Sequence, residues 1–99
     1  MSPAALDDLV VQSDTVLSAA TDDEVLAMDE ASGACFSMGG SGMAIWAAAK
    51  APIAVRDLCA VLMRRYRIDA AECERQTLAY VGQLLDEGLL RLVSPQTGG

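Results

Sequence analysis

The chain has 99 residues, of which 53% are hydrophobic and 21% charged, and its formal net charge is −7. A chain of this length buries a single core, and this composition excludes both a disordered protein and an apolar run long enough to cross a bilayer. We therefore expect one folded domain without contact to a membrane. No export signal is recognisable at the N-terminus, so the expected location is the cytoplasm.

The negative charge lies entirely in the first half of the chain. Residues 1–49 hold eight acidic side chains and no basic one, whereas residues 50–99 hold seven basic and six acidic side chains. Such a field repels phosphate backbones and tolerates or attracts a neutral or basic peptide. Solubility alone would also account for this charge.

The chain has few residues of the types that bind metal ions or act as catalytic nucleophiles. Cys35, Cys59 and Cys73 lack CxxC spacing, and the chain has no histidine to complete a zinc site or to activate a cysteine. We interpret the cysteines as reduced, small apolar side chains. No cofactor, metal ion or catalytic residue is predicted.

Three short strands are expected in the first half. Residues 1–14 are mixed in character and predict a ragged arm with a few contacts. Strands are then predicted at 15–19, 24–29 and 34–38, joined by turns at 21–23 and 30–33. Gly33 suits a positive φ in the second turn. This order predicts a short antiparallel meander.

Two helices are predicted next. The glycine-rich segment 39–42 breaks the third strand, lacks the spacing of a phosphate-binding loop, and leads into a helix at 43–49 with Trp46 in the core. A second helix follows Pro52, and its basic run at 64–67 falls in the last turn, where cations offset the helix dipole. Its predicted buried face consists of Val55, Leu58, Cys59, Leu62 and Tyr66.

The third helix has the clearest boundaries. Asp69 is placed as an N-cap with Glu72 three residues later, and Gly88 stands at the C′ position, which predicts a helix over 70–87. Its apolar arc is wider than one buried stripe needs, so some apolar surface should face a partner. Residues 89–93 suit a short extended segment and 94–99 a flexible tail, so the expected domain spans 15–93.

Several segments, in this order, resemble the PqqD-like family of RiPP recognition elements over residues 15–90. The matching segments are 24–29 before the Gly33 turn, 35–38, 45–46, 55–58, 66–69 and 84–90. Gly39 and Ala54 depart from the pattern, since members commonly have Asn and a small hydroxyl residue there, and both changes weaken helix caps. The implied fold is α+β, winged helix-turn-helix-like, with a three-stranded antiparallel sheet followed by three helices.

The resemblance implies a peptide-binding function. The third strand would be an open sheet edge to which the leader segment of a ribosomally synthesised precursor peptide adds as a further strand, with its side chains in the groove beside the third helix. The leader would be presented to a separate maturation enzyme. Lasso peptide biosynthesis, with a leader peptidase and a cyclase, is preferred; the alternative is the role of PqqD itself, which serves a radical SAM enzyme.

The implied peptide-binding residues come from two elements. Strand alternation places Phe36 and Met38 on the core side and Cys35 and Ser37 on the other. Ordinary core packing is the alternative for the apolar helix residues, above all Val81 and Leu84. The strand residues are Ala34, Cys35, Phe36, Ser37 and Met38, and the helix residues are Thr77, Leu78, Tyr80, Val81, Leu84 and Leu85.

Two other classes of function find little support in the sequence. A winged-helix DNA-binding protein needs a basic recognition helix, but 70–87 carries only Arg75 against four acidic residues. An enzyme would have to rely on acidic pairs such as Asp22-Asp23, which fall in predicted turns. An open sheet edge also allows two copies to pair into a homodimer.

Overall fold

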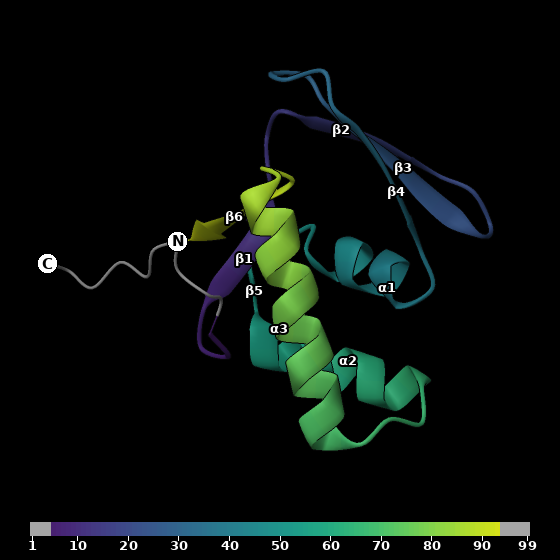
Figure 1. The fold of residues 1–99 in the computed structure, drawn as a ribbon, viewed down its shortest axis with the longest axis vertical. Coiled ribbons are helices and arrows are strands. Elements are labelled where there is room, and N and C mark those ends of the chain that lie inside the picture. Colours follow the sequence, from purple (N-terminus) through teal and green to yellow (C-terminus); the bar gives the residue numbers. More distant parts are fainter. Residues whose placement is uncertain (1–4, 94–99) are drawn as a thin grey trace, which may run out of the picture.

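The computed structural model describes residues 5–93, which form strands and helices arranged as Figure 1 shows. The strands form two antiparallel sheets, in the orders β2-β3-β4 and β5-β1-β6. In chain order the elements are β1 (Leu9–Gln12), β2 (Val16–Ala20), β3 (Glu24–Asp29), β4 (Cys35–Gly39), α1 (Ser41–Ala48), β5 (Ile53–Ala54), α2 (Val55–Arg65), α3 (Ala70–Asp86) and β6 (Leu90–Val93).

The predicted meander is confirmed as β2-β3-β4. The turn between β2 and β3 is held by the Thr21 hydroxyl, which accepts from the Asp23 and Glu24 amides at 3.3 and 3.2 Å. The turn between β3 and β4 uses Gly33 at φ 77°, a region that glycine enters without steric cost. Both turns match the expected positions, and the α+β class of the fold is confirmed.

Asp29, at the end of β3, organises the chain around that second turn. Its carboxylate accepts from the Thr15 hydroxyl at 2.9 Å, from the Ala31 amide at 3.2 Å and from the Ser32 hydroxyl at 3.1 Å. These bonds favour the charged form, the Thr15 bond most, and they hold the pKa of the carboxyl below its usual value of 3.8. The Thr15 bond also ties the segment before β2 to the end of β3.

The second sheet was not expected. Residues 1–14 were predicted as a ragged arm, and this is wrong for Leu9–Gln12, which forms the central strand between β5 and β6. Val10 in this strand is fully buried and Val11 nearly so. The run of three apolar residues is too short to show strand periodicity, and its partner strands lie in the middle of the chain and near its described C-terminal end. Residues 1–4 and 94–99, also predicted as arm and tail, lie outside the described residues.

The start of α2 lacks a side-chain cap, as Ala54 predicted, but its backbone donors are satisfied in another way. The Val55 amide donates to the Asp8 carbonyl and the Arg56 amide to the Leu6 carbonyl, both at 3.0 Å. Arg56 also forms an ion pair with Asp7. The segment before β1 therefore replaces the missing cap.

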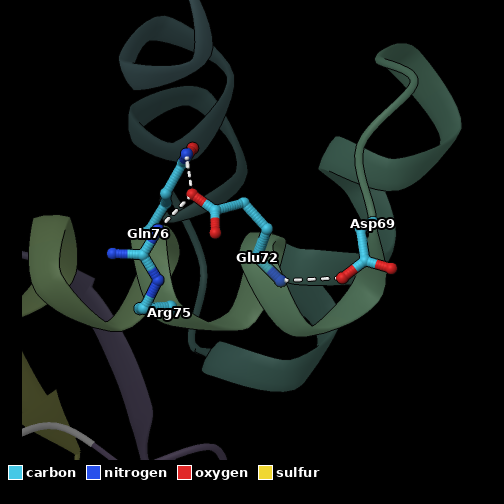
Figure 2. Close-up of polar contacts among 4 residues, drawn as sticks. All are labelled: Asp69, Glu72, Arg75 and Gln76. Atoms are coloured by element: carbon cyan, nitrogen blue, oxygen red, sulfur yellow. Dashed lines mark hydrogen bonds and ion pairs between the residues drawn. The ribbon is translucent and has the colours of Figure 1, made fainter.

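The ends of α3 match the sequence prediction. Asp69 accepts from the Glu72 amide at 3.3 Å, while the Glu72 carboxylate accepts from the side chains of Arg75 and Gln76 within the helix (Figure 2). At the other end Gly88 has φ 81°, and the Leu89 amide donates to the Leu84 carbonyl at 3.0 Å, which is a Schellman ending.

One core joins both sheets and the three helices. Trp46 is 3% exposed, which confirms its predicted place, and α1 lies on the side of the β2-β3-β4 sheet that faces the other helices (Figure 1). None of the described helices is long and apolar enough to span a membrane. The most deeply buried large side chains are Val10, Val55, Leu58, Val81, Leu89 and Leu90.

Because β1 is the central strand of its sheet, shortening Val10 should destabilise the whole domain. We expect Val10→Ala to lower the free energy of unfolding by about 2 kcal/mol, from lost burial of two carbon atoms and the cavity that remains. Leu92→Ala, on the neighbouring β6 at 49% exposure, is the control and should cost under about 0.5 kcal/mol. Urea unfolding measures both; equal, small losses would contradict a structural role for β1.

The Asp29 network predicts a pH-dependent contribution to stability. Its carboxyl pKa is lowered on folding, so the stabilisation is complete above the unfolded-state value of 3.8 and disappears as pH falls through the lower folded-state value. Thr15→Val should therefore destabilise the protein at neutral pH and have less effect in acid, as followed by urea unfolding across this range. Thr21→Val, which removes a hydroxyl bonded only to backbone groups, should cause a loss that does not vary with pH.

Candidate functional site

β4 is an open edge of its sheet. Within residues 5–93 its only partner strand is β3, and the N-terminal strand β1 belongs to the other sheet. The edge that the sequence predicted to be free is therefore not covered by the described part of the N-terminal arm. An edge of this kind presents unpaired backbone donors and acceptors to a visiting strand.

The hydrogen-bond pattern shows which backbone groups are free. The Asp29 amide donates to the Ala34 carbonyl at 2.9 Å, and in an antiparallel ladder bonded and non-bonded pairs alternate from there. The N–H and C=O groups of Phe36 and Met38 consequently point to β3. Those of Cys35 and Ser37 point outward, at the free edge.

The side chains of β4 alternate as predicted. Met38 is 2% exposed and Phe36 is half-buried against the core, whereas Cys35 and Ser37 are exposed on the other face. Ala34 precedes the strand and is half-buried. The Ser37 hydroxyl donates to the Glu24 carboxylate at 2.6 Å, so an acidic group lies on the outward face directly beside the free edge.

Tyr80 of α3 is held against the start of α1, which follows β4 directly. A Cβ atom on Gly42 would lie 2.5 Å from the Tyr80 hydroxyl oxygen, so only glycine permits this approach. The ring is half-buried, and burial raises the pKa of its hydroxyl. Tyr80 is thus an α3 residue that the structure brings next to the start of α1.

A cavity of about 380 Å³ lies between the three helices beside Tyr80. It is lined by apolar side chains with a few hydroxyl and amide groups, a composition common in ligand pockets. Ile45, Ile68 and Gln76 belong to it and were not predicted as site residues. The full lining is Ser41, Ile45, Leu62, Tyr66, Ile68, Cys73, Gln76, Thr77 and Tyr80.

The other α3 residues divide into two groups. Thr77, Val81 and Leu84 are buried in the core, and of these Thr77 also lines the cavity. Leu78 and Leu85 are half-buried, but at about 100° per residue they lie on the flank of α3 opposite to Tyr80. The structure therefore brings Tyr80 and Thr77, but not Leu78 and Leu85, towards the cavity and the start of α1.

The cysteines differ in their surroundings. Cys59 and Cys73 are buried, and burial is the main cause that raises the pKa of the Cys59 thiol, while Cys35 is exposed on the sheet. Among residues 5–93 no cluster of three or more potential metal ligands is found.

Comparison with known proteins gives a consistent result. Residues 24–90 match the family described as coenzyme PQQ synthesis protein D (PqqD). The chain is also similar to a solved structure, TbiB1 in complex with the TbiA(beta) leader peptide, at 25% sequence identity and a TM-score of 0.79, with 86% of this chain and 99% of that chain covered. No curated protein matches. The family match spans more than half of the sequence, and the chain therefore belongs to the PqqD-like family of RiPP recognition elements.

Proposed function

We propose that the protein binds the leader segment of a ribosomally synthesised precursor peptide as a further strand on β4 and presents it to a separate maturation enzyme. The single observation that carries this proposal is the open β4 edge with the outward backbone groups of Cys35 and Ser37. Backbone pairing gives affinity that depends little on sequence, while pockets beside the strand select particular side chains.

The similarity to TbiB1 supports this use of the edge. That protein was solved in complex with a leader peptide, and its chain is covered almost entirely by the similarity. A peptide strand on β4 would have Phe36 beside it and Tyr80 near its end. We assign the contacts to the β4 backbone, Phe36 and Tyr80, with Val81 and Leu84 supporting them from the core.

The cavity beside Tyr80 provides the selective part of the site. Its volume of about 380 Å³ accommodates a large apolar or aromatic side chain, and its hydroxyl and amide groups offer a polar end with which such a side chain can bond. An apolar anchor in the leader would enter here while its backbone pairs with β4.

The enzyme served by this protein is proposed to be the leader peptidase of lasso peptide biosynthesis, working with a cyclase. A radical SAM enzyme, as for PqqD itself, is the alternative. Neighbouring genes for a transglutaminase-like protease and an asparagine-synthetase-like cyclase would support the first role, and a radical SAM enzyme gene the second. The protein itself supplies binding and presentation and no catalytic step.

Removing one outward donor at the β4 edge should weaken leader binding. Ser37→Pro removes an N–H that points away from β3, so the sheet itself keeps its bonds. We expect roughly tenfold weaker binding of a synthetic leader peptide from the adjacent precursor gene, from a lost hydrogen bond and the bulk of the ring. Isothermal titration calorimetry measures this loss.

Two controls separate this effect from others. Ser18→Pro makes the same change at the β2 edge, where the residue also points outward, and should leave leader affinity unchanged. Ser37→Ala removes only the hydroxyl bonded to Glu24 and should change affinity by less than about twofold. Equal losses for Ser37→Pro and Ser18→Pro would argue against pairing at β4.

The two flanks of α3 should contribute unequally. Tyr80→Ala removes an aromatic side chain beside the cavity and should weaken leader binding by about tenfold. Leu85→Ala, a half-buried residue on the opposite flank, should change it by less than about twofold, after correction for any unfolded fraction measured by circular dichroism. If Leu85→Ala weakened leader binding more than Tyr80→Ala, the leader would bind on the Leu85 flank of α3, and this assignment would be contradicted.

A further inference from the structure

The outward face of the β2-β3-β4 sheet is apolar and exposed. Leu17, Leu26 and Met28 expose 54%, 52% and 40% of their surface. The register places Leu17 opposite Met28 and Leu26 opposite Ala19, so these side chains lie together on one face. They border a shallow depression of about 390 Å³. Clustered exposed apolar groups of this kind mark interaction surfaces.

The border of this face is acidic. Glu24 stands on the same face as Leu26 and Met28, since their side chains alternate with the buried Val25 and Ala27. Exposed Asp22 and Asp23 lie at the β2–β3 end of the sheet, and exposed Glu30 at the opposite end. Arg65 of α2 lines a separate depression together with Asp22 and Asp23, whereas no basic residue occurs among residues 1–49 to offset Glu24 and Glu30.

The face is continuous with the free edge of β4. Met28 pairs with Cys35 and Leu26 with Ser37, so both rows of outward side chains end on the strand that offers its backbone to a peptide. A strand added there would continue the rows with its own alternate side chains. The bound leader and the apolar face would then form one surface.

We infer that this face docks the maturation enzyme, through an apolar area on that enzyme bordered by lysine or arginine. This docking role rests on the proposed function, in which the protein presents the leader to a separate enzyme. The acidic border favours the enzyme over a second copy of this chain as the partner. If two copies packed face to face, their acidic side chains would repel one another. The enzyme would recognise the leader and its carrier together.

Leu26→Lys tests this assignment in the full chain. The measurements are affinity for the synthetic leader peptide, and affinity for the purified maturation enzyme encoded beside this gene, with and without leader. We expect leader affinity to stay within about twofold, and enzyme affinity to fall by about tenfold or more. Leu92→Lys, an equally exposed leucine in the other sheet, should leave both unchanged. Raising salt from about 50 to about 500 mM should weaken enzyme binding.

Two results would overturn the inference. One is unchanged enzyme affinity for Leu26→Lys; the other is a dimer of the wild-type chain in sedimentation velocity that Leu26→Lys dissociates, because a second copy would then occupy the face. Failure of the leader to bind the wild-type chain would instead refute the proposed function, while the enzyme measurements would still decide the role of this face.

Discussion

The antiparallel ladder between β3 and β4 is the constraint on which the site depends. It uses the backbone groups of Phe36 and Met38 and leaves those of Cys35 and Ser37 at the free edge. The same alternation sends Phe36 and Met38 to the core and Cys35 and Ser37 to the outward face. One register therefore sets which groups can pair with a peptide and which side chains form the exposed apolar face.

The N-terminal segment keeps that edge available by pairing elsewhere. β1 is the centre of the second sheet, and the carbonyls of Leu6 and Asp8 satisfy the start of α2. A short apolar strand next to an open edge could otherwise add to it, since free edges recruit strands. Burial of Val10 in the shared core holds β1 in the second sheet, and the bond between Thr15 and Asp29 fixes the segment that joins β1 to the meander.

Elements with strong hydrophobic periodicity or clear cap and turn residues could be predicted from the sequence. Strands that form only by pairing with segments far away in the sequence could not. Asp69, Gly88 and Gly33 act within a turn or two of chain, so their roles could be predicted. β1 could not be, because its partners Ile53 and Leu92 lie far along the chain. The open β4 edge followed from the family resemblance, but the flank of α3 that faces the site did not. It is set by the close approach of Tyr80 to Gly42 and by the cavity that Tyr80 lines, both of which depend on how α1 packs against α3.

The most direct test of the account is amide hydrogen exchange at β4, measured by NMR with and without the leader peptide. In the free protein the amides of Phe36 and Met38 should be protected by β3, while those of Cys35 and Ser37 exchange freely. Leader binding should protect Cys35 and Ser37. Binding that leaves these two amides unprotected, or protects Ser18 on β2 instead, would contradict strand addition at β4.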